Sequence, residues 1–495
     1  MAQETVQAVT TSAAQEGVIS YTPADFAAAR PNTALDMINR LPGFTFDGGE
    51  NVRGFAGAAG NVLIDGQRPT IKTDTLSDML SRITIDQVER IDLIRGGAPG
   101  IDMQGRTVIA NVIRKRVDTF QQVLSLQAFA FAQTGDTIPG WNYQATRRAG
   151  EHQFDFQLAR GIAYDDSVGF AERTTLDVAT GDVLRERVEN EAEGPVYSAR
   201  ANYKGPMFGG TLSINGLLST DEFKDESFIY SPTTSERFVG RSANDRGEIG
   251  VNYLRPLGDK FEIEALVLSK LGVGSGDSLG DTGAANLQSR AEAEAGESIG
   301  RGVLRYTHSP ALSFEGGGEV AFNYRDQQVS LTVNGAPVPL PASDVRVEEL
   351  RGEVYAQGTW RPNPQWSIEA GARVERSTLT QTGQTALERS FNYPKPRFLA
   401  TWSPTKHDQV RVRIEREVGQ LDLRDFSSSV DLNADRVDAG NSNLEPDKRW
   451  IYEAAFEKRF WEKGAVVATF RHEDIEDVLD QFPFLVLVDD NGDGI

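Results

Sequence analysis

Most of this chain alternates polar and apolar residues with a period of two, and this pattern limits the folds open to it. Clear examples are the runs 153–158, 366–375 and 410–415, where charged or amide side chains alternate with apolar ones. Such alternation predicts strands with two different faces. The charged set is dense, of mixed sign and repeated over many strands. That suits a wide barrel with a wet lumen and lipid outside better than a soluble sandwich with one packed face. We therefore expect an antiparallel, up-and-down membrane β-barrel.

Composition narrows the class of protein further. The chain has 495 residues, of which 39% are hydrophobic, so it can form a large fold. No apolar run approaches the roughly 20 residues of a transmembrane helix, which excludes an inner-membrane protein. A β-barrel is not excluded, because the polar and apolar residues of its strands alternate and average out in any hydropathy window. The net charge of -21 argues against a partner made of nucleic acid.

Catalytic signals are missing from the sequence. There is no cysteine, and the four histidines lie far apart without metal-ligand spacing. Paired acids such as Asp165-Asp166 and Glu473-Asp474 are adjacent on predicted strands, so their side chains face opposite ways. No nucleophile elbow, phosphate-binding loop or zinc motif is present. We expect neither an enzyme nor a cofactor.

The first residues, Met1-Ala-Gln-Glu, carry neither a basic segment nor an apolar segment of a signal peptide. This start is compatible with a mature exported protein that has an added methionine. On this feature alone a cytosolic protein is equally compatible.

Residues 20–117 have a different pattern, typical of a small α+β domain. Thr33 and Asp36 stand at N-cap and N3 of a helix predicted over 34–41. A second helix is predicted over 76–83, where apolar residues recur at i, i+3, i+4 and i+7. Strands are predicted over 61–65, ending in an Asp65-Gly66 turn, and over 88–94.

Four glycine-punctuated motifs follow one another in this domain: Leu41-Pro42-Gly43, Arg53-Gly54, Ile64-Asp65-Gly66 and Val88-Glu89-Arg90-Ile91-Asp92-Leu93-Ile94-Arg95-Gly96. Their order and spacing resemble the plug domain of TonB-dependent outer-membrane receptors. The chain departs from the family just afterwards, because the segment 97–105 keeps the glycines but lacks the usual aromatic residue. We read this as a subfamily variant and transfer no ligand contacts to the plug apex.

The resemblance implies roles for the plug charges and for the N-terminus. Arg53, Glu89, Arg90, Asp92 and Arg95 would lock the plug to the barrel wall through ion pairs that a pulling partner can release. The alternative is that they are solvated or locally paired surface charges, each contributing about 0–1 kcal/mol. Within the flexible segment 1–19, the best candidate for a TonB box is Glu4-Thr5-Val6-Gln7-Ala8-Val9, which would pair with an edge strand of TonB. It is equally compatible with a terminus that has no role.

Turns and loops in the sequence predict the number of strands in the barrel, residues 118–495, and the connections between them. Short polar turns recur at 148–152, 204–209, 255–260, 308–310, 361–365, 403–408 and 462–464. Longer connections are predicted at 271–286, 333–344 and 419–447. Aromatic residues beside the short turns (Trp360, Trp366, Trp402, Phe460 and Trp461) suit an interfacial girdle or ordinary strand packing. Seven turns and a final outward strand give about 15 strands, whereas receptors of this kind close with about 22. We therefore expect a barrel that is truncated and incomplete at its C-terminus.

The last residues carry a weak metal signal. Asp489, Asn491 and Asp493 have the oxygen spacing that opens a calcium-binding loop, although the acid that would complete it is not in the sequence. A plain acidic turn fits equally well.

The resemblance implies a receptor-transporter in the outer membrane of a Gram-negative bacterium. Its partners would be TonB, outer-membrane lipid and a scarce small ligand, most commonly a ferric siderophore. Uptake of a carbohydrate or another nutrient, and a non-transporting binding protein, remain alternatives. Lumen arginines such as Arg373, Arg411 and Arg413 could attract an anionic chelate. They alternate with Glu369, Glu375 and Glu415, however, so the wall is expected to neutralise itself.

Overall fold

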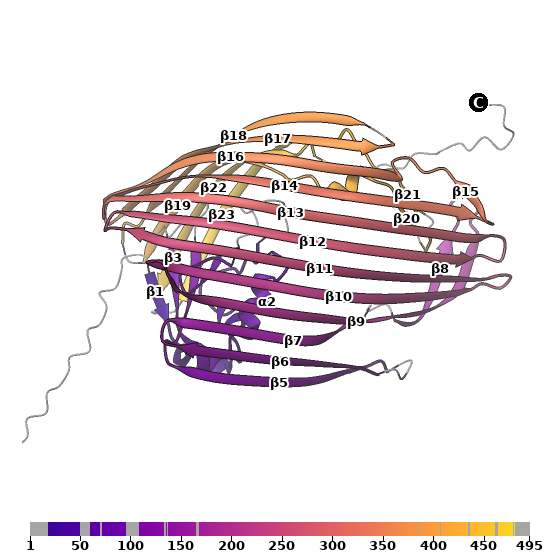
Figure 1. Ribbon diagram of the computed structural model, residues 1–495, viewed down its shortest axis with the longest axis horizontal. Helices are drawn as coiled ribbons and strands as arrows, with labels where there is room; N and C mark the ends of the chain where they lie inside the picture. The colour runs from indigo at the N-terminus through magenta and orange to yellow at the C-terminus, as the bar shows by residue number, and fades with distance from the viewer. Residues whose placement is uncertain are drawn as a thin grey trace, which may run out of the picture.

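The fold is a small α+β domain, called the plug below, enclosed at one end of a large β-barrel (Figure 1). The computed structural model describes residues 18–49, 60–69, 72–95, 108–132, 135, 137–164, 168–384, 386–405, 407–433, 436–460, 464–478 and 480. Among these residues, no helix has the length and apolar character to cross a membrane.

The plug is a four-stranded sheet with short helices packed on it. Its elements are β1 (Val18–Tyr21), η1 (Pro23–Ala29), α1 (Ala34–Ile38), β2 (Val62–Ile64), α2 (Leu76–Arg82), η2 (Ile85–Gln87), β3 (Val88–Arg95) and β4 (Val108–Arg114). The sheet order is β1-β3-β4-β2, with only β2 and β4 parallel among its pairs.

Local sequence signals explain the plug helices. The Thr33 hydroxyl accepts a hydrogen bond from the Asp36 amide, and the Asp36 carboxylate accepts one from the Thr33 amide at 3.0 Å. This capping box confirms the predicted helix start, although α1 ends at Ile38, earlier than expected. Both helices bury apolar residues against the sheet, as Met37 and Leu80 show.

The barrel strands follow in chain order. They are β5 (Thr119–Ala130), β6 (Thr137–Ala149), β7 (His152–Tyr164), β8 (Gly169–Leu176), β9 (Val183–Met207), β10 (Gly210–Tyr230), β11 (Ser235–Leu257), β12 (Phe261–Asp281), β13 (Asn286–Ser309), β14 (Leu312–Val333), β15 (Ala336–Val338), β16 (Asp344–Asn363), β17 (Trp366–Gly383), β18 (Leu387–Trp402), β19 (Asp408–Val418), β22 (Lys448–Phe460) and β23 (Gly464–Glu476). A short helix, η3 (Leu423–Phe426), and a hairpin of β20 (Ser429–Asp431) and β21 (Arg436–Asp438) lie between β19 and β22.

The barrel strands form one continuous antiparallel sheet in chain order. It begins at β5, passes through β9 and β10 to β19, and ends at β22 and β23. Antiparallel registers join β22 to β23 and β5 to β6, but among the described residues no residue-by-residue register joins β23 to β5. The sheet is therefore not closed between β23 and β5 among these residues, which confirms the predicted incomplete barrel.

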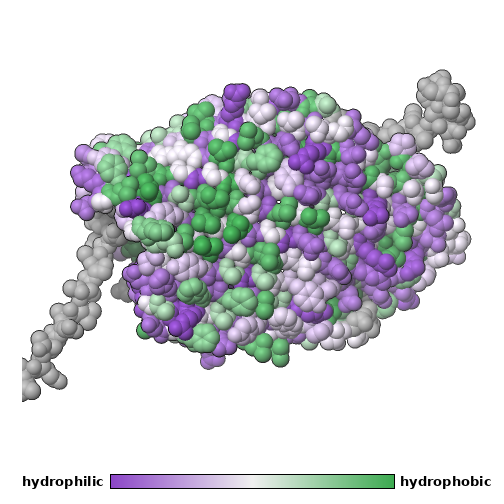
Figure 2. Space-filling model, viewed as in Figure 1, coloured by the Kyte–Doolittle hydropathy of each residue, from purple (hydrophilic) through white to green (hydrophobic). Residues whose placement is uncertain are grey.

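Alternation along the strands separates a polar lumen from an apolar outer face, as predicted. In β17, Val374 is 53% exposed on the outside, whereas the neighbouring Glu375 is 2% exposed inside. Figure 2 shows hydrophobic residues gathered over the middle and left of one face, with mostly hydrophilic residues at the opposite end from the plug. Trp366 and Trp402 stack outside at 5.8 Å, beside the short turns.

Six of the seven predicted turns connect two consecutive strands, and the seventh, 462–464, lies mostly outside the described residues. One predicted loop is wrong. The segment 271–286 is not a long connection, because β12 continues to Asp281 and β13 begins at Asn286. Its glycines suggested a loop. Gly272, Gly274 and Gly276 instead pair on both sides, with β11 and with β13. Hydrogen bonds from two neighbours hold a strand of low intrinsic propensity.

The wall of the barrel is uneven in height. Strands β9 to β14 have 21–25 residues each, whereas β5, β6, β7, β19, β22 and β23 have 11–13. A membrane-spanning strand needs about 9–11 residues, so β9 to β14 project well beyond the bilayer.

Candidate functional site

The Leu-Pro-Gly motif places a tight turn against β3 of the plug. Gly43 has φ of +65°, and a Cβ there would lie 3.0 Å from Arg95 Nη2. The same Arg95 nitrogen donates a 2.9 Å hydrogen bond to the Pro42 carbonyl. Glycine is therefore required both by the left-handed backbone and by the close approach of Arg95. The first and last plug motifs are joined through this contact.

Arg95 also connects the plug to the barrel wall. Its Nε lies 3.2 Å from Glu457 Oε1 on β22, and the two side chains are 1% and 0% exposed. Glu457 additionally pairs with Arg411 and Arg459 on the wall. Burial lowers the pKa of Arg95 to about 10 although Glu457 opposes the shift, so Arg95 stays protonated at neutral pH. We call this pair the Arg95 anchor.

The Asp-Gly motif forms a turn whose carboxylate is held inside the plug. Asp65 and Gly66 have φ of 51° and 78°. The Asp65 carboxylate accepts hydrogen bonds from Arg114 N at 2.9 Å and Arg114 Nε at 2.8 Å. Burial raises the pKa of Asp65, but Arg114 and Lys204 outweigh burial and hold it below its usual value. Arg148 of the wall lies 3.7 Å from the same carboxylate.

A second buried connection between plug and wall involves Lys72. Its Nζ lies 2.9 Å from Glu297 Oε2, with the two side chains 3% and 2% exposed. Glu248 accepts hydrogen bonds from the Lys72 and Thr73 amides at 2.5 Å and 2.7 Å. Burial lowers the pKa of Lys72 to about 8, against the opposing effect of Glu297. We call these contacts the Lys72 anchor.

Asp74 makes a third, mixed contact. Its carboxylate is bound by Arg82 of α2 within the plug and lies 3.3 Å from Arg200 Nε on β9. Gln144 of β6 donates a 3.3 Å hydrogen bond to the Arg82 carbonyl. This group therefore joins α2 to two strands of the wall.

The other charges of the last plug motif pair locally. Arg90 pairs with Glu89 at 2.7 Å and with Asp92 at 3.0 Å, and Ser20 of β1 donates a hydrogen bond to Asp92. These three charged residues make no ion pair with the wall among the described residues. Of the described plug charges expected to lock the plug to the wall, Arg95 therefore makes an ion pair with the wall, whereas Glu89, Arg90 and Asp92 do not.

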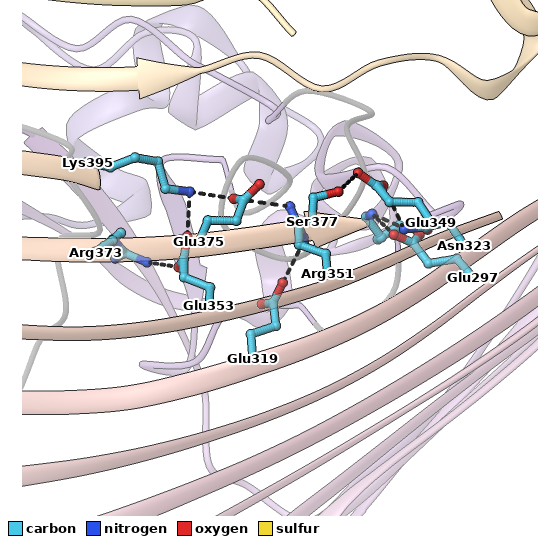
Figure 3. A network of polar contacts seen from close by, with 11 residues as sticks. Glu297, Glu319, Asn323, Glu349, Arg351, Glu353, Arg373, Glu375, Ser377 and Lys395 are labelled. Carbon is cyan, nitrogen blue, oxygen red and sulfur yellow. Dashed lines mark hydrogen bonds and ion pairs between the residues drawn. The ribbon is translucent and has the colours of Figure 1, made fainter. Parts of the chain in front are cut away.

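Along the inner face of the wall, acidic and basic side chains form a connected network (Figure 3). Lys395 lies 2.5 Å from Glu353 and 2.7 Å from Glu375, and Arg351 lies 2.7 Å from Glu319. Arg373 pairs with Glu353 and lies over a tyrosine ring on β16. Arg411 and Arg413 pair with Glu457 and Glu415. These wall charges therefore neutralise one another, as the alternation of sign predicted.

The described residues of the segment 419–447 pack against the inner face of the wall. Phe426 is fully buried and packs with Leu421 and Leu423 against Val347 and Leu379 of the wall. Gln327 on β14 donates a 2.9 Å hydrogen bond to the Ser428 carbonyl. We call this segment the inner loop.

Comparison with protein-family models identifies the family of this chain. Residues 118–491 match the family model described as TonB dependent receptor-like, beta-barrel, and residues 10–108 match the TonB-dependent Receptor Plug Domain. The chain belongs to the TonB-dependent receptor family. Members of this family are receptors of the Gram-negative outer membrane and not enzymes, so this receptor is an outer-membrane protein.

Solved structures of several receptors are similar to this one, whereas a sequence comparison with curated proteins finds no match. The ferripyoverdine receptor of Pseudomonas aeruginosa, bound to ferripyoverdine, is 11% identical with a TM-score of 0.50, over 93% of this chain and 63% of that chain. The siderophore receptor PiuA from Acinetobacter baumannii is 12% identical with a TM-score of 0.48, over 92% and 72%. The unliganded ferric citrate transporter FecA is 15% identical with a TM-score of 0.48, over 89% and 67%. At such identities the likeness concerns the fold alone.

Several predicted site residues lie outside the described part of the receptor. They are the TonB-box candidate Glu4 to Val9, the plug residues Arg53, Gly54 and Gly96, and the calcium candidates Asp489, Asn491 and Asp493. Their roles remain predictions.

Sequence reasoning missed the Lys72 anchor and the Asp74 contact. Both residues lie in a polar connection before α2, where lysine and aspartate are ordinary. Their partners stand well over 100 positions later on barrel strands. A local pattern carries no signal for such a pair.

Proposed function

We propose that this receptor takes up a scarce ligand, a ferric siderophore, when TonB pulls on its plug. The observation that carries the proposal is that the plug is held in the lumen by polar and ionic contacts to the wall. Among the described residues, Arg95 and Lys72 make two such contacts with both side chains almost fully buried. Such contacts are directional and can be exchanged for water, so a pulled plug can leave without dissolving a shared apolar core.

The ligand class rests on the family resemblance, in which siderophores are the commonest cargo. The TonB-binding role belongs to residues 4–9. Pairing of an extended segment with an edge strand of TonB needs only backbone groups, so side-chain identity there is secondary.

A neutral nutrient such as a carbohydrate is the second candidate, because the charges of the wall network in Figure 3 are paired with one another. Asn323 and Ser377 hydrogen bond to the same acid, Glu349. A wall whose acids and bases are paired with each other, and with buried amide and hydroxyl groups, would not select strongly for an anionic cargo.

Growth tests in a host lacking its own ferric-siderophore receptors separate these candidates. Cells expressing the receptor would be supplied with citrate, hydroxamate or catecholate ferric chelates as the sole iron source, or with oligosaccharides as the sole carbon source. We expect growth on at least one ferric chelate, lost when TonB is absent or residues 4–9 are deleted. TonB-dependent growth on a saccharide alone would replace the siderophore with the second candidate. Growth on none of them would count against both.

A further inference from the structure

A cavity of about 140 Å³ lies between the plug and the barrel wall. Residues of β2, α2 and β4 line it from the plug, and residues of β6, β7, β9, β10 and β11 line it from the wall. A water molecule takes up about 30 Å³ in the liquid, so the cavity holds a few water molecules or one small polar solute.

Positive charge exceeds negative charge around this cavity. The charged side chains that line it, together with those joined to them by ion pairs, comprise six basic groups and three acids among the described residues. They are Arg68, Arg82, Arg114, Arg148, Arg200 and Lys204, with Asp65, Asp74 and Asp155. The plug and the wall both contribute cations, so two surfaces with a positive excess face each other here.

The three acids are already engaged by arginines. Asp65 lies 2.7 Å from Arg114, which also lies 3.9 Å from Asp155. Asp74 is bound by Arg82. Wall arginines on β6 and β9 lie 3.7 Å from Asp65 and 3.3 Å from Asp74. Each carboxylate therefore already has at least one guanidinium beside it.

Lys204, on β9, is the cation that these acids do not reach. Among the described residues it makes no ion pair, and its Nζ donates one hydrogen bond, to the Asp65 carbonyl at 3.4 Å. This bond is long for an N–H···O contact. An ammonium group has three N–H donors, so donors remain for a group in the cavity. A half-buried ammonium beside arginines is stabilised most by an anion, because water hydrates it without offsetting the charge.

The other donors at the cavity suit an oxyanion. Arg114 lines it with a planar guanidinium, a group that matches carboxylate and phosphate oxygens. Gln67 of the plug accepts a 3.1 Å hydrogen bond from Ser213 through its Oε1, so its amide nitrogen remains a donor. Asn202 of β9 adds a second amide to the lining.

We propose that one small oxyanion, a phosphate or a carboxylate, binds in this cavity between Lys204 of the wall and Arg114 of the plug. It bridges two surfaces that carry the same sign of charge, and so it strengthens docking of the plug on β6, β7 and β9. The proposal goes beyond the uptake function above and needs neither cargo nor TonB, so the two can fail or hold separately.

Phosphate and acetate are the probes, each exchanged for chloride at constant ionic strength with the purified full chain in detergent. Protease digestion of the plug reports the undocked fraction, with unchanged heat-modifiable mobility as the control for the barrel. At a probe concentration about ten times its Kd, linkage predicts about a tenfold decrease in the undocked fraction. A response to phosphate alone or to acetate alone assigns the class of oxyanion.

Lys204→Met should abolish this response. Lys260→Met is the matched control, because Lys260 is exposed in the turn between β11 and β12 and should leave the wild-type response intact. Wild-type docking that is insensitive to both probes, or an equal response in Lys204→Met, would overturn the proposal.

Lys204→Glu provides a second reading, because it places a carboxylate of the protein itself beside Arg114. We expect this variant to dock its plug without added oxyanion as firmly as the wild type does with it, and to be insensitive to both probes. Weaker docking of Lys204→Glu than of the wild type in chloride would contradict the bridging anion.

Discussion

At the residue scale, the two buried anchors decide how firmly the plug is held. A sequence motif identified Arg95 as a charge of interest together with Glu89, Arg90 and Asp92, but the motif could not tell which of them points at the wall. Position along β3 decides this. Arg95, at the end of the strand, meets Glu457, whereas Arg90 is surrounded by acids of its own strand.

Replacing Arg95 should loosen the plug far more than replacing Arg90. Arg95→Ala leaves Glu457 buried with fewer positive partners, and we expect plug docking to lose about 3 kcal/mol. Arg90→Ala removes exposed pairs and should cost at most about 1 kcal/mol. Protease digestion of the plug in the folded receptor measures the difference. Equal susceptibility of the two variants would argue against the Arg95 anchor.

The Lys72 anchor should give plug docking a dependence on pH. The pKa of docked Lys72 is about 8, below the 10.5 of a free lysine. As pH rises from about 8 to about 10.5, the undocked lysine keeps a proton that the docked one has lost, so docking becomes more favourable over this window and is constant below it.

Thermal unfolding in detergent at about pH 7 and about pH 9.5 measures this effect. The Tm of the wild-type receptor relative to Lys72→Met should rise between the two pH values. Lys72→Met keeps Glu297 paired with Lys270, so it is a mild variant. The same pH response in both proteins would show that Lys72 is not the group responsible.

At the element scale, the features that could be predicted from the sequence are those that depend on residues close together in the chain. The capping box at Thr33 and the turn at Asp65-Gly66 form as expected, since each depends on residues three or fewer positions apart. The glycine-rich part of β12 misled the analysis, because its strand state is imposed by β11 and β13. The inner loop was predicted as a long connection, but its inward fold depends on distant strands.

Phe426 should determine whether the inner loop stays folded. It is fully buried against the wall, so Phe426→Ala should cost about 3–5 kcal/mol of local packing and release the loop. Val437→Ala, in β21 of the same loop and 44% exposed, should have little effect. Limited proteolysis within residues 419–447 distinguishes them, with unchanged heat-modifiable mobility as the control for the barrel. Equal cleavage of both variants would mean that Phe426 does not hold the loop.

At the scale of the whole molecule, periodicity predicted the architecture because lipid and lumen impose one face each on every strand. Periodicity could not predict how far each strand extends beyond the bilayer, since β9 to β14 keep alternating far beyond the length that crosses a bilayer. Nor could it place the plug within the barrel, because the residues that join them, such as Lys72 and Glu297, lie on separate elements.

The central claim is that a plug held by polar contacts sits inside an independently stable barrel and can leave it. Urea titration of the purified receptor tests this, with proteolysis of the plug and heat-modifiable mobility of the barrel followed in the same samples. We predict that the plug becomes cleavable at urea concentrations where the barrel still migrates as folded. A single transition shared by both readouts would contradict the account.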